Sequence, residues 1–406
     1  MTSASTSVLT SAHTDPSPRP KQPTLVVLQL TGGNDPVNTL IPYTDPLYYD
    51  NRPKVHVPEA DVLKIDGQYG FHPSMAAIKP FWDDGKLAII NGIGYENPNY
   101  SHFRSMDIWY TAQPEVIVTD GWLGQAVRAL DPMAENVLTA VNFGRGLPRA
   151  LSLAGVPVAS VAQLDSYGLL TSLAGVDERN SALEAFSCMY DDGFNDDKIV
   201  KPLKHAHPED PMSTVMRYMG QTGLDAQKGA EILGTTLRSY ASTVQYPTTE
   251  LGSYLKGIAQ VKLAGFGTRV FYTAHGSFDT HASQLVTHKL LWTEISEAVA
   301  AFFADLREHD ASDDVIMLIW SEFGRRVKDN GAGTDHGAGG MAMVLGDPVL
   351  GGLYGQYPSL KERDLTVGNL QYNNDFRSTY STILERWLGV EAQPIVNGHF
   401  EQFAFV

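Results

Sequence analysis

The sequence of 406 residues predicts an α/β domain in which helices pack on a mainly parallel β-sheet. Several short runs are almost continuously apolar and β-branched, as expected of strands buried on both faces of a sheet. Segments with an apolar period near 3.6 residues lie between these runs. Polar residues gather where the runs end. Because an open α/β sheet binds ligands beyond the carboxyl ends of its strands, the run ends are the predicted functional edge.

The composition is that of a globular protein and limits its partners. With 43% hydrophobic and 19% charged residues, the chain is neither collagen-like, nor a coiled coil, nor wholly disordered. The chain has 30 basic and 46 acidic residues, a formal net charge of −16, which repels a phosphate backbone or an anionic membrane surface. We therefore expect no nucleic acid and no membrane among its partners. The sequence leaves the oligomeric state open.

The chain begins with a segment of different character. Residues 1–23 are rich in Ser, Thr and Pro and contain no apolar run long enough for a signal-peptide core or a membrane span. This predicts a disordered leader before a soluble protein. The expected location is the cytoplasm, or outside it if an export signal was removed.

The predicted strands and helices follow one another along residues 24–406. The first strand, TLVVLQL, begins at Thr24 and stops at the turn TGGND, where glycines permit a sharp change of direction. The helix predicted at 284–309 has regularly spaced apolar residues, and the one at 376–388 ends before Gly389. Further buried strands are predicted at residues 86–95, 269–279, 314–323 and 341–347.

The segment from about 165 to 262 differs from the rest of the chain. It is richer in Ala, Ser and charged residues, with helical patterns such as 212–242 and few strand-like runs. We interpret it as a mainly helical insertion or cap on one domain that spans residues 24–406. Cys188, the only cysteine, lies in it and is expected to be a buried structural residue. One cysteine permits neither an intrachain disulfide nor a thiolate cluster, so any metal ligands must be Asp, Glu and His.

Four polar clusters follow predicted strands and could carry chemistry. Each cluster taken alone also has a structural interpretation: an Asp after Gly-Gly often caps a helix, and Ser before a helix is commonly its N-cap. Carboxylates and imidazoles from separate strand ends would together suit Zn²⁺, Mn²⁺, Mg²⁺ or Ca²⁺. The clusters contain Asp35; Ser101, His102 and Asp107; His275, Asp279 and His281; and Glu322, Asp335 and His336.

The order of these motifs resembles the domain-of-unknown-function family fifteen-oh-one, a largely bacterial branch of the alkaline phosphatase and sulfatase superfamily. The resemblance implies a three-layer α/β/α sandwich, alkaline phosphatase-like, with one or two metal ions at the strand ends. The motifs that carry it are LQLTGGNDPVNTLIPY (28–43), GFHPSM (70–75), NPNYSHF (97–103), GSFDTHASQ (276–284), SEFGRRVKDNGAGTDHGAGG (321–340) and DFRSTYSTILERWLG (375–389).

The resemblance also implies roles for individual residues. Asp35 matches the first metal ligand, and Ser101 is the candidate nucleophile. The remaining metal ligands implied are Asp279, His281, Glu322, Asp335 and His336. Arg325 or Arg326 could clamp a tetrahedral oxyanion, or could be a solvated ion-pair partner.

Three departures from the superfamily pattern limit the inference. Phe323 stands where relatives have His, so one metal site could be depleted or could recruit His102. Asp279 and His281 are closer in sequence than the usual pair, and Ala338 replaces a further expected His. The Cys/Ser-x-Pro-x-Arg motif that generates formylglycine is absent around Ser101, so a type-I sulfatase is not implied.

Three functions compete at this stage. The first is a metallohydrolase that cleaves phosphate or sulfate esters with a metal-activated Ser or water. The second uses a bound water on another ester or a sugar-linked substrate. The third is a non-catalytic module that binds a metal or glycan. For the enzymatic functions we expect a small anionic ester or a glycan as substrate.

Overall fold

The computed structural model describes residues 21–162 and 240–406, together with the single positions 164, 178, 181, 229 and 233. The expected leader lies almost wholly outside these residues. So do Cys188, the helical pattern at 212–242 and most of the expected insertion. Within the described residues, no helix is both long and apolar enough to cross a membrane.

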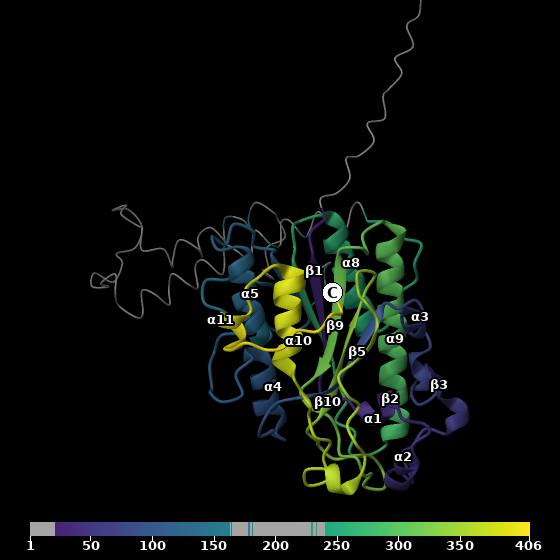
Figure 1. Ribbon diagram of the computed structural model, residues 1–406. Coiled ribbons are helices and arrows are strands. Elements are labelled where there is room, and N and C mark those ends of the chain that lie inside the picture. Colours follow the sequence, from purple (N-terminus) through teal and green to yellow (C-terminus); the bar gives the residue numbers. More distant parts are fainter. Residues whose placement is uncertain are drawn as a thin grey trace, which may run out of the picture.

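Nine strands of the described chain form one sheet at the centre of the molecule (Figure 1). All pairs in it are parallel except those of β10, which runs antiparallel to both β5 and β9. Strand β12 (Asn374–Asp375) extends the pairing of β5. In spatial order the others are β11 (Gly352–Tyr354), β5 (Leu87–Gly94), β10 (Gly340–Leu345), β9 (Val315–Ser321), β1 (Thr24–Leu30), β8 (Val270–His275), β6 (Ala140–Phe143) and β7 (Ala159–Val161).

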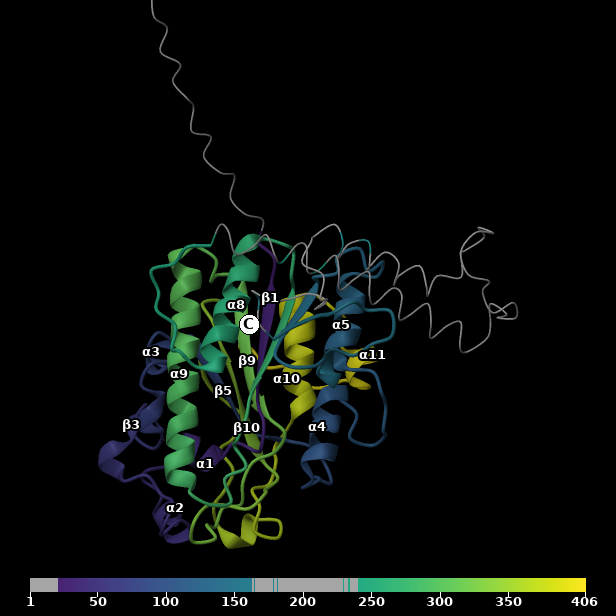
Figure 2. The ribbon, with the colours of Figure 1, turned by 180° about the vertical axis from the view of Figure 1, so that it is seen from behind.

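Helices cover both faces of the sheet, as Figures 1 and 2 show from opposite sides. One face packs against α3 (Lys79–Asp83), α8 (Glu250–Ala264) and α9 (Gln284–Glu308). The other packs against α4 (His102–Thr111), α5 (Trp122–Leu130), α10 (Phe376–Thr382) and α11 (Gln393–Val396). A π-helical segment, Ile383–Leu388, continues α10 and ends at Gly389. The predicted α/β/α sandwich is therefore confirmed.

The alternation of side chains along β1 explains why the sheet is buried on both faces. Val26, Leu28 and Leu30 enter one hydrophobic core, whereas Leu25 and Val27 enter the other. Successive side chains of a strand point to opposite faces, so a continuous apolar run is what a central strand requires. Fully burying one such side chain contributes about 1.5–3 kcal/mol.

A smaller unit packs beside the functional edge. It contains the three-stranded sheet β2 (Leu40–Ile41), β4 (Gly70–Phe71) and β3 (Leu63–Lys64). Two short helices, α1 (Pro36–Thr39) and α2 (Pro46–Asn51), each begin with an Asp N-cap followed by Pro. The described 3₁₀ turns are Glu59–Asp61, Pro73–Met75, Arg149–Leu151 and Glu362–Asp364.

The direction of β10 changes one expectation from the sequence. Its carboxyl end, where Asp347 follows, lies at the edge opposite the other strand ends, because β10 is antiparallel to its neighbours. There Asp347 accepts hydrogen bonds from Arg307 and Ser312. The amino end of β10 instead lies at the functional edge, which brings the preceding loop with Asp335 and His336 back to it.

Candidate metal centre

Four side chains from three separate segments meet at the functional edge and are called here the His–Asp cluster: His102, Asp279, His281 and His336. His102 is the first residue of α4. Asp279 and His281 follow β8, and His336 lies in the loop between β9 and β10. Among the described residues, His102, Asp279 and His336 form the one group of three or more potential ligands close enough to share a metal ion.

The carboxylate of Asp279 is the centre of the cluster. Its Oδ1 lies 3.0 Å from His281 Nε2 and 2.9 Å from His336 Nε2. Its Oδ2 lies 3.4 Å from His102 Nε2. The Nε2 atoms of His281 and His336 are themselves 3.0 Å apart. Three imidazole nitrogens therefore face one carboxylate.

The other ring nitrogen of each histidine has its own oxygen partner. His102 Nδ1 lies 2.9 Å from Glu322 Oε1, and His281 Nδ1 lies 3.1 Å from Asp335 Oδ1. His336 Nδ1 lies 2.8 Å from the Tyr100 carbonyl oxygen. Carboxylate and carbonyl oxygens only accept hydrogen bonds, so each Nδ1 carries the hydrogen. With an ion bound, each ring held in this way would present its Nε2 lone pair to that ion, which is the arrangement of metal-ligating histidines.

The donor set discriminates among the four cations considered from the sequence. Ca²⁺ and Mg²⁺ prefer oxygen ligands, whereas Zn²⁺ and Mn²⁺ accept imidazole together with carboxylate. Three imidazoles and one carboxylate without sulfur therefore suit Zn²⁺ best and Mn²⁺ next. The four side chains of the His–Asp cluster could hold such an ion.

Glu322 and Asp335, expected as ligands, instead contact the histidines from outside. Glu322 is fully buried, and its Oε1 also accepts from the amide of Gly32 at 2.8 Å. Its hydrogen bond with His102 raises the pKa of that imidazole, against the lowering effect of burial. Hydrogen bonds from Asn330 and His281 lower the pKa of Asp335. Both acids orient imidazoles and keep negative charge next to the cluster.

Arg325 holds Asp279 in place from beneath the cluster. Its guanidinium is fully buried, and Nη2 donates to Asp279 Oδ1 at 2.7 Å. Burial would raise the pKa of Asp279, but hydrogen bonds from Arg325 and His336 lower it to about 2. The buried guanidinium does not face an incoming oxyanion, which differs from the clamp expected of it. Its other acceptors are the carbonyl oxygens of Gly32, Gly33, Phe278 and Thr334.

Gly32 allows the loop after β1 to lie against the loop that carries Asp279. Its φ of +116° belongs to a backbone region that favours glycine. A Cβ at this position would lie 2.4 Å from the amide nitrogen of Asp279. The close approach of the two loops therefore needs glycine at position 32. This contact fixes the position of the Asp279 backbone relative to β1.

Asp35 lies outside the His–Asp cluster. Its carboxylate is fully buried and forms an ion pair with Arg52, whose side chain is also fully buried. It caps α1 by accepting from Val37 N at 3.1 Å and also accepts from Gln284. Burial would raise the pKa of Asp35, and the charge and hydrogen bonds of Arg52 lower it below its usual value. This placement differs from the ligand role expected from the sequence, because a cation, Arg52, already neutralises the carboxylate.

Ser101 and Arg326 remain accessible beside the cluster. Ser101 is exposed and is the N-cap of α4, yet its hydroxyl makes no capping bond. Of the residues on either side of it, His102 belongs to the cluster and Tyr100 contacts His336 through its carbonyl oxygen. Arg326 is exposed, and its charge acts on Asp335. It forms no ion pair with any other described residue.

Phe323 completes the site as an apolar wall. It is 4% exposed, and its ring lies 5.0 Å from that of His102 and 4.8 Å from that of His336, centroid to centroid. The sequence raised the possibility that His102 compensates for a histidine missing at this position, and the structure brings His102 into the cluster.

Two partners of the site were not anticipated from the sequence. The Tyr100 oxygen that binds His336 belongs to the backbone, so no side-chain motif marks it. Arg52 lies 17 residues after Asp35, in a stretch with no recognisable pattern. The signal that could have been used is Gln284, which ends the motif GSFDTHASQ and reaches Asp35 from the start of α9.

Fold and site together define a class: an α/β/α sandwich with an imidazole and carboxylate cluster beyond the carboxyl ends of its parallel strands. The family model described as "Protein of unknown function (DUF1501)" matches residues 207–395, somewhat less than half of the chain. The matched segment contains Asp279, His281 and His336, whereas His102 precedes it. A comparison with curated proteins gives no match.

Several solved structures are similar over most of the chain. The structure of "Ps i-CgsB" has 9% identity and a TM-score of 0.39, covering 94% of this chain and 75% of that one. The PsFucS1 sulfatase from Pseudoalteromonas sp. has 12% identity and a TM-score of 0.39, with coverages of 95% and 71%. The phosphonate monoester hydrolase of Agrobacterium radiobacter has 12% identity and a TM-score of 0.32, with coverages of 93% and 78%. Similarity at this level defines neither the activity nor the ligands of this chain.

Proposed function

We propose that this protein is a metal-dependent hydrolase of phosphate or sulfate esters and a member of the DUF1501 family. The observation that carries the proposal is the His–Asp cluster, in which each imidazole has Nδ1 bound to an oxygen acceptor and Nε2 directed at Asp279. The Nε2 atoms of His281 and His336 lie 3.0 Å apart, and a cation between them would bind both lone pairs at once.

The chemistry assigns roles to the residues around the cluster. A Zn²⁺ or Mn²⁺ ion held by His102, Asp279, His281 and His336 would supply a Lewis acid that activates a hydroxyl or water and offsets oxyanion charge. Glu322 and Asp335 orient the imidazoles that hold it. Arg325 positions Asp279.

The nucleophile and the binding of the anionic group involve accessible residues. Ser101 presents an uncommitted hydroxyl at the N-terminus of α4, where the helix dipole favours negative charge. The exposed guanidinium of Arg326 can attract the anionic ester and, unlike that of Arg325, can turn toward it. The alternative nucleophile is a water at the same cluster.

The first experiment measures metal content and ester cleavage on the same protein. Purified protein should contain close to one equivalent of Zn²⁺ or Mn²⁺ and should hydrolyse at least one aryl phosphate, phosphodiester or sulfate. Both properties should be lost in His336→Ala. The exposed His399 supplies the matched control, because His399→Ala removes an imidazole that lies outside the His–Asp cluster. Metal-free wild-type protein, or a His336→Ala variant with full activity, would contradict the proposal.

A second experiment separates serine from water as the nucleophile. If Ser101 is the nucleophile, Ser101→Ala should lower kcat by about 10³-fold or more while metal content stays unchanged. If a water attacks, Ser101→Ala should retain most of the activity. That result would favour the water-based mechanism, with the metal centre unaffected.

A further inference from the structure

Two loops carry three of the four side chains of the His–Asp cluster, and these loops lie directly against each other. The Asp279 loop, residues 276–283, follows β8, and the His336 loop, residues 330–337, lies between β9 and β10. The Thr334 amide donates to the Thr280 carbonyl oxygen at 3.1 Å. A Cβ added at Gly333 would lie 2.1 Å from the same oxygen, so no space separates the two backbones at this point.

The side chains of Thr334 and Gln284 join the same two loops. Both residues are fully buried, and Gln284 is the first residue of α9, directly after the Asp279 loop. Gln284 Nε2 donates to the Asp35 carboxylate, which can only accept, so Gln284 Oε1 is left as an acceptor. The Thr334 hydroxyl donates to this Oε1 at 2.7 Å. The hydroxyl therefore has a buried partner of fixed orientation on the neighbouring segment.

The backbone of Thr334 reaches the Asp279 carboxylate through Arg325. Arg325 Nη1 donates to the Thr334 carbonyl oxygen at 3.0 Å, and Nη2 donates to Asp279 Oδ1 at 2.7 Å. His336 follows Thr334 by two residues and lies 2.9 Å from the same Asp279 oxygen. A displacement of Thr334 would therefore move His336 along the chain and Asp279 through the guanidinium.

We propose that Thr334 is a positioning residue of the metal centre, whose hydroxyl bond to Gln284 holds the two loops at the spacing where their side chains can share an ion. The proposal rests on the proposed metal-dependent function. A hydroxyl with a structural role alone would contribute to the stability of the fold and leave the affinity for metal unchanged. A positioning hydroxyl also contributes to that affinity, because ligand atoms displaced by about 0.5 Å bind an ion less tightly.

Thr334→Val tests the hydroxyl alone, because valine replaces it by a methyl group and keeps the branch at Cβ. The measurements are the affinity for Zn²⁺, by competition with a chelator of known affinity, and the absorption spectrum of the Co²⁺-loaded protein. Thr334→Val should bind Zn²⁺ about tenfold or more weakly than the wild type, and its Co²⁺ bands should shift. Thr334→Ser restores the hydroxyl and should return both measurements close to the wild-type values.

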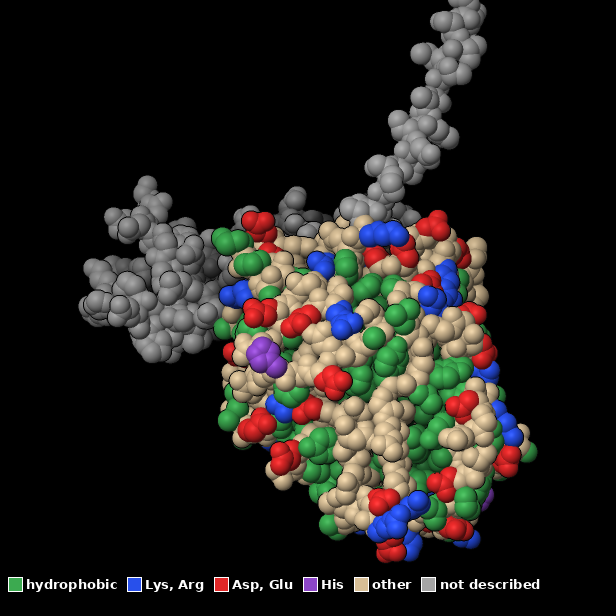
Figure 3. All heavy atoms as spheres, in the orientation of Figure 1, with side chains coloured by type: hydrophobic (Ala, Val, Ile, Leu, Met, Phe, Trp, Pro, Cys, Tyr) green, Lys and Arg blue, Asp and Glu red, His purple; other side chains and the backbone are tan. Residues whose placement is uncertain are grey.

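Bound Zn²⁺ reports on the cluster rather than on the outer surface. On the face that Figure 3 shows, acidic side chains lie scattered among basic and apolar ones. Among the described residues, the cluster contains the one group of three or more potential ligands close enough together to share an ion. His336→Ala, which lacks a ligand, gives the background value that is subtracted.

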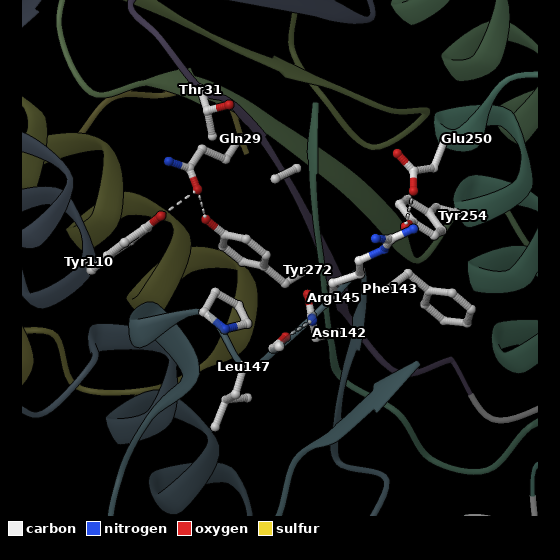
Figure 4. A pocket seen from close by; sticks show the side chains of 14 residues that line it. Gln29, Thr31, Tyr110, Asn142, Phe143, Arg145, Leu147, Glu250, Tyr254 and Tyr272 are labelled. Carbon is white, nitrogen blue, oxygen red and sulfur yellow. Dashed lines mark hydrogen bonds between the residues drawn. The ribbon is translucent and has the colours of Figure 1, made fainter. Parts of the chain in front are cut away.

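Two matched controls separate positioning from a general loss of stability. Thr382 is as buried as Thr334 and donates to the Ser378 carbonyl oxygen at 2.7 Å within α10. Gln29 is 1% exposed and accepts from the hydroxyls of Tyr110 and Tyr272, which joins α4 to the sheet (Figure 4). The variants Thr382→Val and Gln29→Met should lower the urea midpoint and keep the Zn²⁺ affinity and the Co²⁺ spectrum of the wild type.

The role of Thr334 is overturned if Thr334→Val keeps the wild-type Zn²⁺ affinity and Co²⁺ spectrum while its urea midpoint falls. Equal weakening of Zn²⁺ binding in Thr382→Val or Gln29→Met would also contradict it, since affinity would then follow overall stability. If Thr334→Val does not fold, Thr334→Ser and Thr334→Ala, which differ by the hydroxyl alone, decide the question with the same measurements. A wild type that binds neither Zn²⁺ nor Mn²⁺ would instead contradict the proposed function together with this inference.

Discussion

Asp35 and Asp279 are two carboxylates at the same edge of one sheet, yet their surroundings differ in almost every respect. The side chain of Asp35 is fully buried and paired with the equally buried Arg52. The side chain of Asp279 is 44% exposed and faces three imidazoles. Both also accept from protein donors that lower the pKa. The position of an acid at a strand end therefore does not decide its role, whereas the charge and accessibility of its partners do.

The comparison also indicates that the two sites have different roles, one in stability and one in metal binding. The Asp35 site connects the segment that carries α1 and α2 to the loop after β9. Arg52, which pairs with Asp35, also donates from Nε to the Val327 carbonyl oxygen at 3.0 Å. The Asp279 site keeps its polar atoms directed at a shared point that solvent can reach. We expect changes at the first to act on stability and changes at the second on metal binding and catalysis.

The largest expected effect is loss of a cluster imidazole. His336→Ala should reduce metal content to background and lower kcat/KM by about 10³-fold or more, since a ligand and its Tyr100 anchor are lost together. The free energy of unfolding of the metal-free variant should stay within about 1–2 kcal/mol of that of the metal-free wild type, because the His336 side chain lies outside the hydrophobic cores and is 22% exposed. Metal analysis and calorimetry check both parts. A variant that kept its metal would place the ion elsewhere.

The next effect is on stability. Asp35→Asn leaves Arg52 buried without its counter-charge and should lower the free energy of unfolding by about 3–5 kcal/mol. Urea denaturation at equal metal loading measures this. The folded fraction should keep its full complement of metal, and a folded but metal-free Asp35→Asn would make Asp35 a ligand after all.

Changes to the outer acids should be smaller. Glu322→Gln and Asp335→Asn keep an oxygen acceptor at each histidine but remove the negative charge, and should weaken metal affinity about 10–100-fold. Competition with a chelator of known affinity gives the value. Complete loss of metal in either variant would instead mean that the acid is a direct ligand, as the resemblance implied.

The smallest effect concerns acid unfolding at the Asp35 site. The folded-state pKa of Asp35 is below its unfolded value near 4, so its contribution to stability is fully present above about pH 4 and is lost as pH falls through the lower folded pKa. Urea midpoints of the wild type should therefore fall more steeply below about pH 4 than those of Asp35→Asn at low temperature. If the urea midpoints of the two proteins fell in parallel with pH, Asp35 would not contribute to acid unfolding.

The long apolar runs made the central strands predictable from the sequence, since a strand buried on both faces leaves little choice of residue. The strands at 24–30 and 314–323 are found within one or two residues as β1 and β9. β6 and β7 were not predicted, because four and three residues are too few to show a period. Strand direction was also not predictable for β10, since an apolar run reads the same in parallel and antiparallel pairing.

The sequence was sufficient to predict which residues gather at the site, but not which of them contact one another. The motifs DTH and TDHG place acids and histidines at the functional edge, and the structure brings Asp279, His281 and His336 together there. Which acid contacts an ion and which orients a histidine differs by a few ångströms, and sequence spacing does not encode that difference.

The most direct test of the metal centre is anomalous diffraction from crystals of the purified protein, collected on both sides of the Zn and Mn absorption edges. The account predicts one anomalous peak bounded by Nε2 of His102, Nε2 of His336 and the Asp279 carboxylate, with His281 Nε2 alongside. A peak beside Asp35, or no peak from protein that cleaves an ester, would contradict it.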